Sequence, residues 1–278
     1  MRRITCATLL AAALGLTPIT GLGQSLEEGV SAGQQGNYQV ALEHFRPLAK
    51  QGDARAQTIL GAMYAHGEGV SLDYQEASTW LRRAAEQGDN LAQFYLGNIY
   101  ANGQGVPQSY QEAADWYQRA AEQGNSDAQL RLGFMYANGQ GVAQNDQEAA
   151  AWYRRSAEQG DTNGQLSLGL LYANGLGLPQ NYQEAVAGYR RAAEQGVAEA
   201  QLNLGVMYSK GQGVSPNPVI AYVLEILAAA QGNKMAHRNR DISLRNLSRE
   251  QVNEGQQLAA EWRIGTPLPT SRNVTTWP

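Results

Sequence analysis

Residues 53–88 read DARAQTILGAMYAHGEGVSLDYQEASTWLRRAAEQG, a stretch of 36 residues. Apolar side chains recur at helical spacing in both halves of it, at Ala56, Leu60, Met63 and Tyr64, and again at Ala77, Trp80, Leu81 and Ala84. Residues spaced three and four apart lie on one face of an α-helix. The stretch therefore predicts two amphipathic helices joined by a turn.

The same unit recurs along the chain with a period of 36 residues. Three columns show it most clearly: Gly52, Gly88, Gly124, Gly160, Gly196 and Gly232; Leu60, Leu96, Leu132, Leu168 and Leu204; and Tyr64, Tyr100, Tyr136, Tyr172 and Tyr208. Several columns that share one period are typical of a repeat array. We expect an all-α solenoid in which each helix pair packs on its neighbours.

Glycine and small polar residues mark the predicted helix ends. Gly67 and Gly69 follow the first helix. They predict its end and a turn, because glycine alone adopts a positive φ at low cost. Asp73 precedes the second helix and, with Glu76 three residues later, predicts a capping box. Equivalent pairs are Ser109 with Glu112, Asn145 with Glu148, and Asn181 with Glu184, while Asn217 precedes Pro218.

Gly61 lies in the middle of a predicted helix, where glycine costs about 1 kcal/mol relative to alanine. Glycine nevertheless occupies this column in five units. We expect a close helix approach at this point, through a backbone contact opposite Tyr64 or the Ala84–Ala85 pair. The column is therefore interpreted as packing and not as a binding site.

The chain resembles the Sel-one-like repeat (SLR) family, whose members are related to tetratricopeptide repeats but have a longer turn between the two helices. The resemblance rests on the strings AQFYLGNIYANGQGV at 92–106 and EAADWYQRAAEQG at 112–124, which recur in register from Asn37 to Gly232. It implies a right-handed α/α superhelix that assembles other proteins. Many bacterial members of the family are exported.

Pattern and composition divide the chain into five segments. Arg2 and Arg3 precede an apolar run that ends near Gly23, as in a cleavable signal peptide, with an uncleaved anchor as the alternative. The segments are a signal peptide at 1–23, an N-terminal capping repeat at 24–52, five Sel-one-like repeats at 53–232, a C-terminal capping helix pair at 233–264, and a disordered tail at 265–278. We therefore expect a periplasmic or secreted protein with no membrane span after cleavage.

Composition excludes several classes of protein. The 278 residues carry a formal net charge of −4 and show no basic stripe, which disfavours a nucleic-acid binder. The one cysteine, Cys6, lies within the predicted signal peptide. The mature chain is thus expected to lack disulfides and cysteine-ligated metals.

The predicted first helices carry an arc of positions that their core stripe does not use. These positions vary from unit to unit while the core repeats, so packing does not dictate them. In helix-pair solenoids the first helices line the concave face, and the arc should form a groove for a protein or peptide. We predict partner-binding residues at Arg55, Ile59, Leu91, Tyr95, Asn98, Asn102, Asp127, Arg131, Phe134, Asn138, Leu170 and Asn203.

Within this arc, Tyr95, Arg131 and Phe134 are the expected anchors, because aromatic residues and arginine dominate binding hot spots. Asn102, Asn138 and Asn174 allow two interpretations, hydrogen bonding to a partner's backbone or capping of their own helix before a glycine. On the second helices, Arg82, Arg83, Arg154 and Arg155 are interpreted as a solvated convex face.

The sequence contains none of the following catalytic or metal-binding motifs. His44, His66 and His237 form no helical zinc motif, and neither Ser-x-x-Lys nor Gly-x-Ser-x-Gly occurs. We predict a non-enzymatic, exported, monomeric scaffold that needs no cofactor or metal. The alternatives are an envelope hydrolase, a β-lactam- or glycan-binding protein, and a self-associating structural protein.

Overall fold

The computed structural model describes residues 22–269, with side chains from Ser25 onward, and this part of the chain is entirely helical. Its helices fall into two compact units, residues 1–144 and 145–278. The first contains α2 (Leu22–Gln34), α3 (Tyr38–Lys50), α4 (Ala54–His66), α5 (Tyr74–Glu86), α6 (Asn90–Asn102), α7 (Tyr110–Glu122) and α8 (Ser126–Asn138). The second contains α9 (Asp146–Glu158), α10 (Thr162–Asn174), α11 (Tyr182–Glu194), α12 (Ala198–Lys210), α13 (Pro218–Ala230), α14 (Lys234–Asn246) and α15 (Arg249–Glu261).

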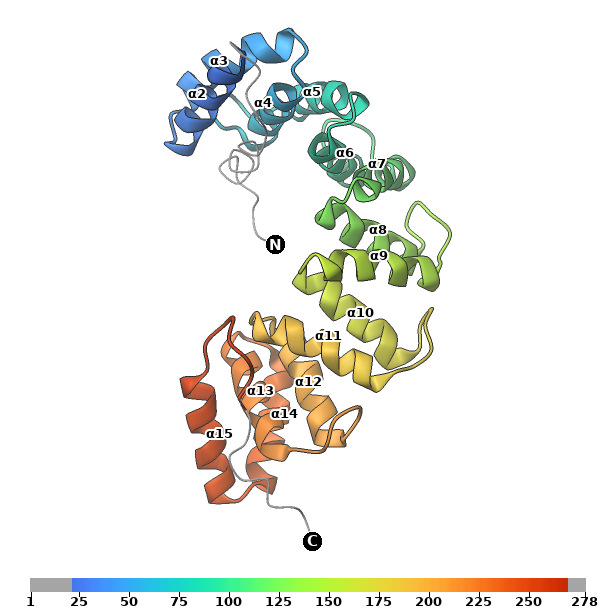
Figure 1. Ribbon diagram of the computed structural model, residues 1–278, viewed down its shortest axis with the longest axis vertical. Helices are drawn as coiled ribbons and strands as arrows, with labels where there is room; N and C mark the ends of the chain where they lie inside the picture. Colours follow the sequence, from blue (N-terminus) through green and yellow to red (C-terminus); the bar gives the residue numbers. More distant parts are fainter. Residues whose placement is uncertain (1–21, 270–278) are drawn as a thin grey trace. The chain divides into compact units, whose positions relative to one another are not determined.

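Within each unit the helices pack as antiparallel pairs that follow one another along the chain (Figure 1). The first helix of a repeat packs on its own second helix, as α4 does on α5 and α12 on α13. Each second helix then packs on the next first helix, as α5 does on α6 and α11 on α12. We call α4, α6, α8, α10 and α12 the first helices, and α5, α7, α9, α11 and α13 the second helices. The predicted solenoid of helix pairs with a 36-residue step is confirmed.

The helices of the repeats begin and end where the glycines and small polar residues of the sequence predict. Each first helix from α4 to α12 ends on a left-handed glycine, with φ between 65° and 68°. The Asp73 side chain accepts hydrogen bonds from the amides of Gln75 and Glu76, which is the cap half of the expected box. The complete reciprocal box forms at Ser248 and Gln251, at the start of α15.

The mid-helix glycines admit a side chain from the paired helix. A Cβ built on Gly97 would stand 2.6 Å from the ring of Tyr117, and one on Gly61 would stand 2.6 Å from Leu81. The expected close approach is therefore confirmed. Its partner differs from the prediction, because the crowding atoms belong to the second-helix column of Leu81 and Tyr117 and not to Tyr64 or the Ala84–Ala85 pair.

On α4, α6 and α12 a buried glutamine ties the first helix to the helices before and after it. The Gln93 Nε2 donates to the Ala85 carbonyl oxygen (3.1 Å), and its Oε1 accepts from the Gln123 Nε2 (2.7 Å). Gln57 and Gln201 make the same two bonds. Because an unsatisfied buried amide costs about 1–3 kcal/mol, these bonds explain why a polar residue persists in a core column.

The N-terminal pair α2–α3 closes the first unit with its own apolar cluster. Leu26, Val30 and Phe45 pack there against Ile59 and Leu60 of α4. Helix α2 begins at Leu22, before residue 24, where the sequence predicts the start of the capping repeat. Most of the predicted signal peptide lies outside the described residues. Among the helices of residues 22–269, none is long and apolar enough to cross a bilayer.

The C-terminal cap departs from the predicted helix pair. Both α14 and α15 pack against α13, so α15 does not serve as the paired second helix of α14. The ring of Tyr222 on α13 lies where a Cβ on Gly255 of α15 would stand, at 2.6 Å. The sequence signal is α13 itself, where Val219 and Tyr222 replace the polar or small residues of the other second helices.

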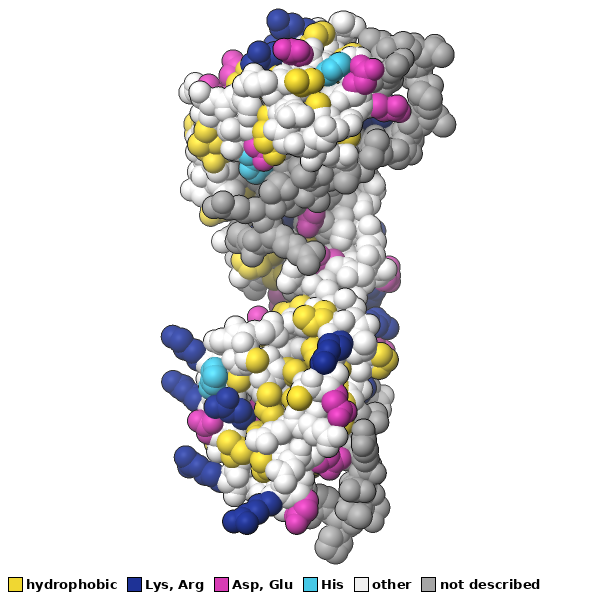
Figure 2. Space-filling model, turned by 90° about the vertical axis from the view of Figure 1, so that its left-hand side faces the viewer, with side chains coloured by type: hydrophobic (Ala, Val, Ile, Leu, Met, Phe, Trp, Pro, Cys, Tyr) yellow, Lys and Arg dark blue, Asp and Glu magenta, His cyan; other side chains and the backbone are white. Residues whose placement is uncertain are grey.

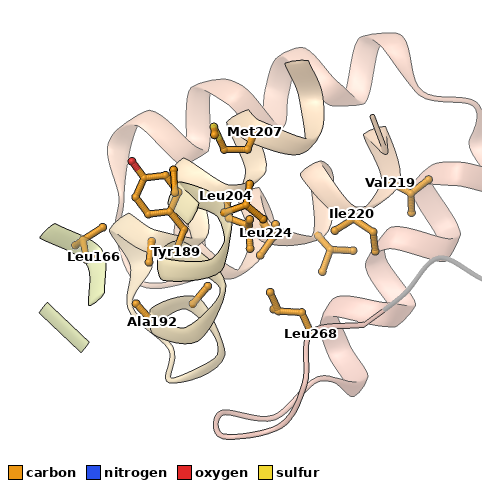
Figure 3. Packing of buried hydrophobic residues seen from close by; sticks show 14 of the residues in the cluster. Leu166, Tyr189, Ala192, Leu204, Met207, Val219, Ile220, Leu224 and Leu268 are labelled. Atoms are coloured by element: carbon orange, nitrogen blue, oxygen red, sulfur yellow. The ribbon is translucent and has the colours of Figure 1, made fainter. Parts of the chain in front are cut away.

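The segment after α15 is packed, in contrast to the disorder expected from residue 265 onward. It runs back to α11 (Figure 1), where the Gly265 amide donates to the Glu194 carbonyl oxygen at 2.7 Å. Leu268 is 6% exposed and points into the cluster that contains Leu204, Ile220 and Leu224 (Figure 3). Residues 270–278 of the predicted tail lie outside the described part.

Candidate functional site

The predicted partner-binding residues all lie on first helices, and we call their arc the first-helix surface. In the N-terminal unit it comprises Arg55 and Ile59 on α4, Leu91, Tyr95, Asn98 and Asn102 on α6, and Asp127, Arg131, Phe134 and Asn138 on α8. In the C-terminal unit it comprises Leu170 on α10 and Asn203 on α12. The residues differ greatly in how accessible they are.

On α4 and α6 the surface is largely occupied by packing. Ile59 is 3% exposed and belongs to the apolar cluster of α2, α3 and α4. Tyr95 is 9% exposed, and its ring meets that of Phe94 edge-on, with 5.6 Å between centroids. Arg55 and Leu91 are half-buried. The expected anchor at Tyr95 therefore offers a partner little area.

On α8 the surface is open. Asp127, Arg131 and Phe134 are all exposed, and the Phe134 side chain is 49% accessible. Aromatic residues and arginine are the residue types enriched at binding hot spots, and here an exposed ring and an exposed arginine lie on one helix. Of the three predicted anchors, Arg131 and Phe134 are thus the two that a partner can reach.

The asparagine column caps its own helices. The Nδ2 of Asn102 donates to the Asn98 carbonyl oxygen (2.8 Å), and that of Asn138 donates to the Phe134 carbonyl oxygen (2.7 Å). Asn174 makes the same bond to Leu170 (2.8 Å). These bonds engage each asparagine amide with a carbonyl oxygen near the end of its own helix, which favours the capping interpretation over contact with a partner.

A tyrosine hydroxyl from a second helix reaches the surface on α6, a contribution that the sequence interpretation missed. The Tyr117 hydroxyl donates to Asn98 Oδ1 at 2.7 Å. Burial raises the pKa of Tyr117 above its usual range and that of Tyr153 and Tyr189 to about 12. All three are therefore neutral at physiological pH and present hydrogen-bonding groups without charge. Their 36-residue spacing was the available signal.

The surface also continues onto α14, beyond the predicted residues. Met235 and Ile242 follow Glu199 and Val206 by one period of 36 residues. They are 53% and 57% exposed. The period alone would have found them, had the capping segment been aligned with the repeats.

The arginines of the second helices lie over aromatic rings. The guanidinium carbons of Arg83, Arg119 and Arg155 lie 4.7, 4.6 and 4.5 Å from the ring centroids of Trp80, Trp116 and Trp152. The Arg190 guanidinium donates to the Tyr208 hydroxyl at 2.7 Å. Cation–π contacts of this kind contribute about 0.5–1 kcal/mol at exposed sites, so these arginines have a structural role.

Residues 22–269 contain no group of three or more His, Cys, Asp or Glu side chains placed to hold a metal ion. His44 instead lies 3.2 Å from the Ser25 hydroxyl oxygen and 3.7 Å from a Glu28 carboxylate oxygen.

The repeats match the Sel1 repeat family model six times, at residues 19–53, 54–89, 90–125, 126–161, 162–197 and 198–233. The first match covers the expected N-terminal cap, so that segment is itself a repeat. A Sel1 repeat protein from Oxalobacter formigenes is 35% identical, with 77% of this chain and 88% of that chain covered and a TM-score of 0.73. A protective antigen of uropathogenic Escherichia coli with an SLR fold is 27% identical over 91% of this chain and 69% of its own, with a TM-score of 0.38. No curated protein matches the sequence.

Proposed function

Because the chain belongs to the Sel1 repeat family, whose members are generally protein-interaction scaffolds, we propose that it is an exported adaptor that binds a protein or peptide on its first-helix surface. We also propose that the protein is monomeric and that it binds its partner without catalysing a reaction.

The observation that carries the proposal is the contrast between the two sets of columns. Leucine occupies the core column in all five repeats; Leu60, Leu96, Leu132 and Leu204 are each at most 1% exposed, and Leu168 is half-buried. One column over, Ile59, Tyr95, Arg131, Ser167 and Asn203 differ in polarity and size. Exposed Arg131 and Phe134 lie in the variable set, where a particular partner can be accommodated without disturbing the core.

Export is supported by the first 23 residues, which combine Arg2 and Arg3 with an apolar run and a small residue at Gly23. A periplasmic or secreted location follows. Measurement of the intact mass of the protein from its own cell tests this part. The expected mass lacks residues 1–23, and a mass that includes them would overturn the proposed cleavage.

Site-specific crosslinking tests the binding surface. A photoreactive benzophenone amino acid replaces Phe134 on α8 in one protein and Tyr110 on α7, which is 40% exposed, in the control. We expect a crosslinked partner from position 134 and none from position 110. Adding Arg131→Glu should reduce the adduct while leaving the circular dichroism spectrum unchanged. Equal adducts from both positions, or an adduct indifferent to Arg131→Glu, would contradict the assignment.

A further inference from the structure

Three apolar side chains form a row across the C-terminal unit. Leu170 on α10, Val206 on α12 and Ile242 on α14 are spaced by 36 residues, so they occupy the same position on successive helices. Leu170 and Val206 are half-buried, and Ile242 is 57% exposed. Repeats present equivalent positions on one face, which places the three side chains in line. We call them the apolar row.

The row ends on a helix that lacks a second helix of its own. Arg240 and Asp241 of α14 occupy the columns that hold buried Leu204 and Gly205 in α12, and they pair with each other at 3.0 Å. Ala236 is the buried residue of α14. Met235, about two helical turns before Ile242 on the same arc, is 53% exposed. Apolar area on α14 is therefore open to a partner.

The margin of the row is basic. Lys210 lies at the end of α12, and Arg238 and Arg245 flank Ile242 on α14; all three are exposed. Lys and Arg side chains line one edge of the C-terminal unit (Figure 2). The acidic residues of α12 and α14 are Glu199 and Asp241, and the charge of Asp241 is balanced by Arg240. A chain with a formal net charge of −4 thus concentrates positive charge at this end of the surface.

We propose that the apolar row and its basic margin bind an acidic peptide segment in which apolar side chains alternate with carboxylates. This inference rests on the proposed function and specifies the partner. Carboxylates complement Lys210, Arg238 and Arg245, and apolar side chains cover the row. Because Leu170 and Val206 are recessed, the row suits individual peptide side chains better than a lipid surface, which takes protruding apolar residues.

Fluorescence anisotropy of the mature chain with three labelled peptides of about 12 residues tests the partner chemistry. The first alternates Leu and Val with Asp and Glu, the second replaces the acids with Lys, and the third replaces the apolar residues with Ser. We expect the first peptide to bind at least about tenfold more tightly than either of the others, with affinity that falls as salt rises. Equal binding of the first and second peptides would overturn the proposal.

Matched variants locate the site. Ile242→Asp and the double variant Arg238→Glu/Arg245→Glu should each weaken the acidic peptide by about tenfold or more. The controls are Leu72→Asp, at a loop residue that is 56% exposed in the N-terminal unit, and Arg249→Glu, at an exposed arginine of α15. Circular dichroism confirms folding of each. If the controls weaken binding as much as the site variants, the apolar row is not the docking surface.

Two further measurements distinguish an acidic peptide from other occupants of the apolar row. Cosedimentation with anionic phosphatidylglycerol vesicles, in the absence of peptide binding, would overturn the proposal in favour of a lipid surface. Self-association that Ile242→Asp abolishes would overturn it in favour of a second copy of the chain. If position 134 crosslinks a partner while the acidic peptide does not bind, the partner chemistry proposed here fails and the adaptor function stands.

Discussion

Gly97 and Gly205 occupy the same position in two repeats, but their surroundings differ. A Cβ on Gly97 would stand 2.6 Å from the Tyr117 ring, whereas the nearest atom to one on Gly205 is the Ala221 carbonyl oxygen at 3.4 Å. The difference arises because Glu225 stands at the position that Tyr117 occupies in the repeat of Gly97. One sequence column therefore contains two packing environments, which substitution can distinguish.

Alanine at these two glycines should have opposite effects. Gly97→Ala forces the buried Tyr117 ring to move and should lower the free energy of unfolding by about 1–3 kcal/mol. Gly205→Ala meets an ordinary contact and gains helix propensity, so it should be neutral or stabilise by up to about 1 kcal/mol. Urea unfolding followed by circular dichroism measures both. Equal shifts in the midpoint would contradict this account of the glycine column.

Glu225 is a carboxyl group that is 4% exposed on α13, with Ser243 donating to it at 2.7 Å. Burial raises the pKa of Glu225 above the usual value of a glutamate, and the Ser243 hydrogen bond opposes the rise. A raised folded-state pKa means that the protonated group stabilises the fold at low pH, and that this stabilisation is lost as the pH rises through the folded-state pKa. Glu225 therefore opposes folding at neutral pH.

Removing that charge should stabilise the protein in a pH-dependent way. Glu225→Gln keeps an oxygen that can accept from Ser243 and carries no charge. We expect a higher thermal midpoint than wild type near pH 7 and little difference near pH 3.5, where the carboxyl is protonated in both states. Scanning calorimetry at the two pH values checks it, and a gain of the same size at both would rule out the charge as the cause.

The helix array ends because α13 differs from the second helices before it. Val219 replaces the exposed glutamines of the other second helices, Tyr222 replaces smaller buried side chains, and α15 packs against this helix. The segment after α15 then crosses to the end of α11, where the Leu268 amide donates to Glu194 Oε1 at 3.2 Å. Gly196, which corresponds to exposed glycines in other repeats, is buried beneath Ile264. The last helices are thus secured by a short segment of chain.

Shortening Leu268 should loosen this end of the molecule. Leu268→Ala removes a side chain that is 6% exposed from the cluster around Leu224, at a cost of about 2–3 kcal/mol. Hydrogen exchange should accelerate in α11, α13 and α15. Leu176→Ala, at a loop residue that is 45% exposed, serves as the control. Unchanged hydrogen exchange in α15 would mean that the segment after α15 does not hold the last helices in place.

Across the whole chain, the 36-residue period accounts for what could be predicted from the sequence. It identified the buried leucine column and the glycines at the helix ends, because those positions depend only on contacts that every repeat makes. The course of α15 could not be predicted this way, since Val219 and Tyr222 occur once and their covering helix is non-periodic. The hydrogen bonds that Gln93 makes to the helices on either side were not predicted, because a polar side chain at a core position does not contribute to an apolar pattern.

The candidate surface was predicted as a set of positions but not as a set of accessible side chains. Tyr95 and Arg131 occupy one column, yet Tyr95 is buried and Arg131 is exposed. Accessibility depends on the neighbours of each helix, and a column does not contain that information. The surface on α14 was missed for a different reason: Met235 and Ile242 keep the period, but the capping segment was not aligned with the repeats.

Repeat arrays bury their side chains only against adjacent helices, so damage should remain local. Leu96→Ala empties a fully buried site on α6, which packs on α5 and α7, and should cost about 2–5 kcal/mol. Hydrogen exchange should rise in α5, α6 and α7 and stay unchanged in α12 and α13. Leu72→Ala, at a side chain that is 56% exposed, should change neither region. A uniform rise over all helices would mean that the chain unfolds as one cooperative domain and that its stability is not a sum over neighbouring repeats.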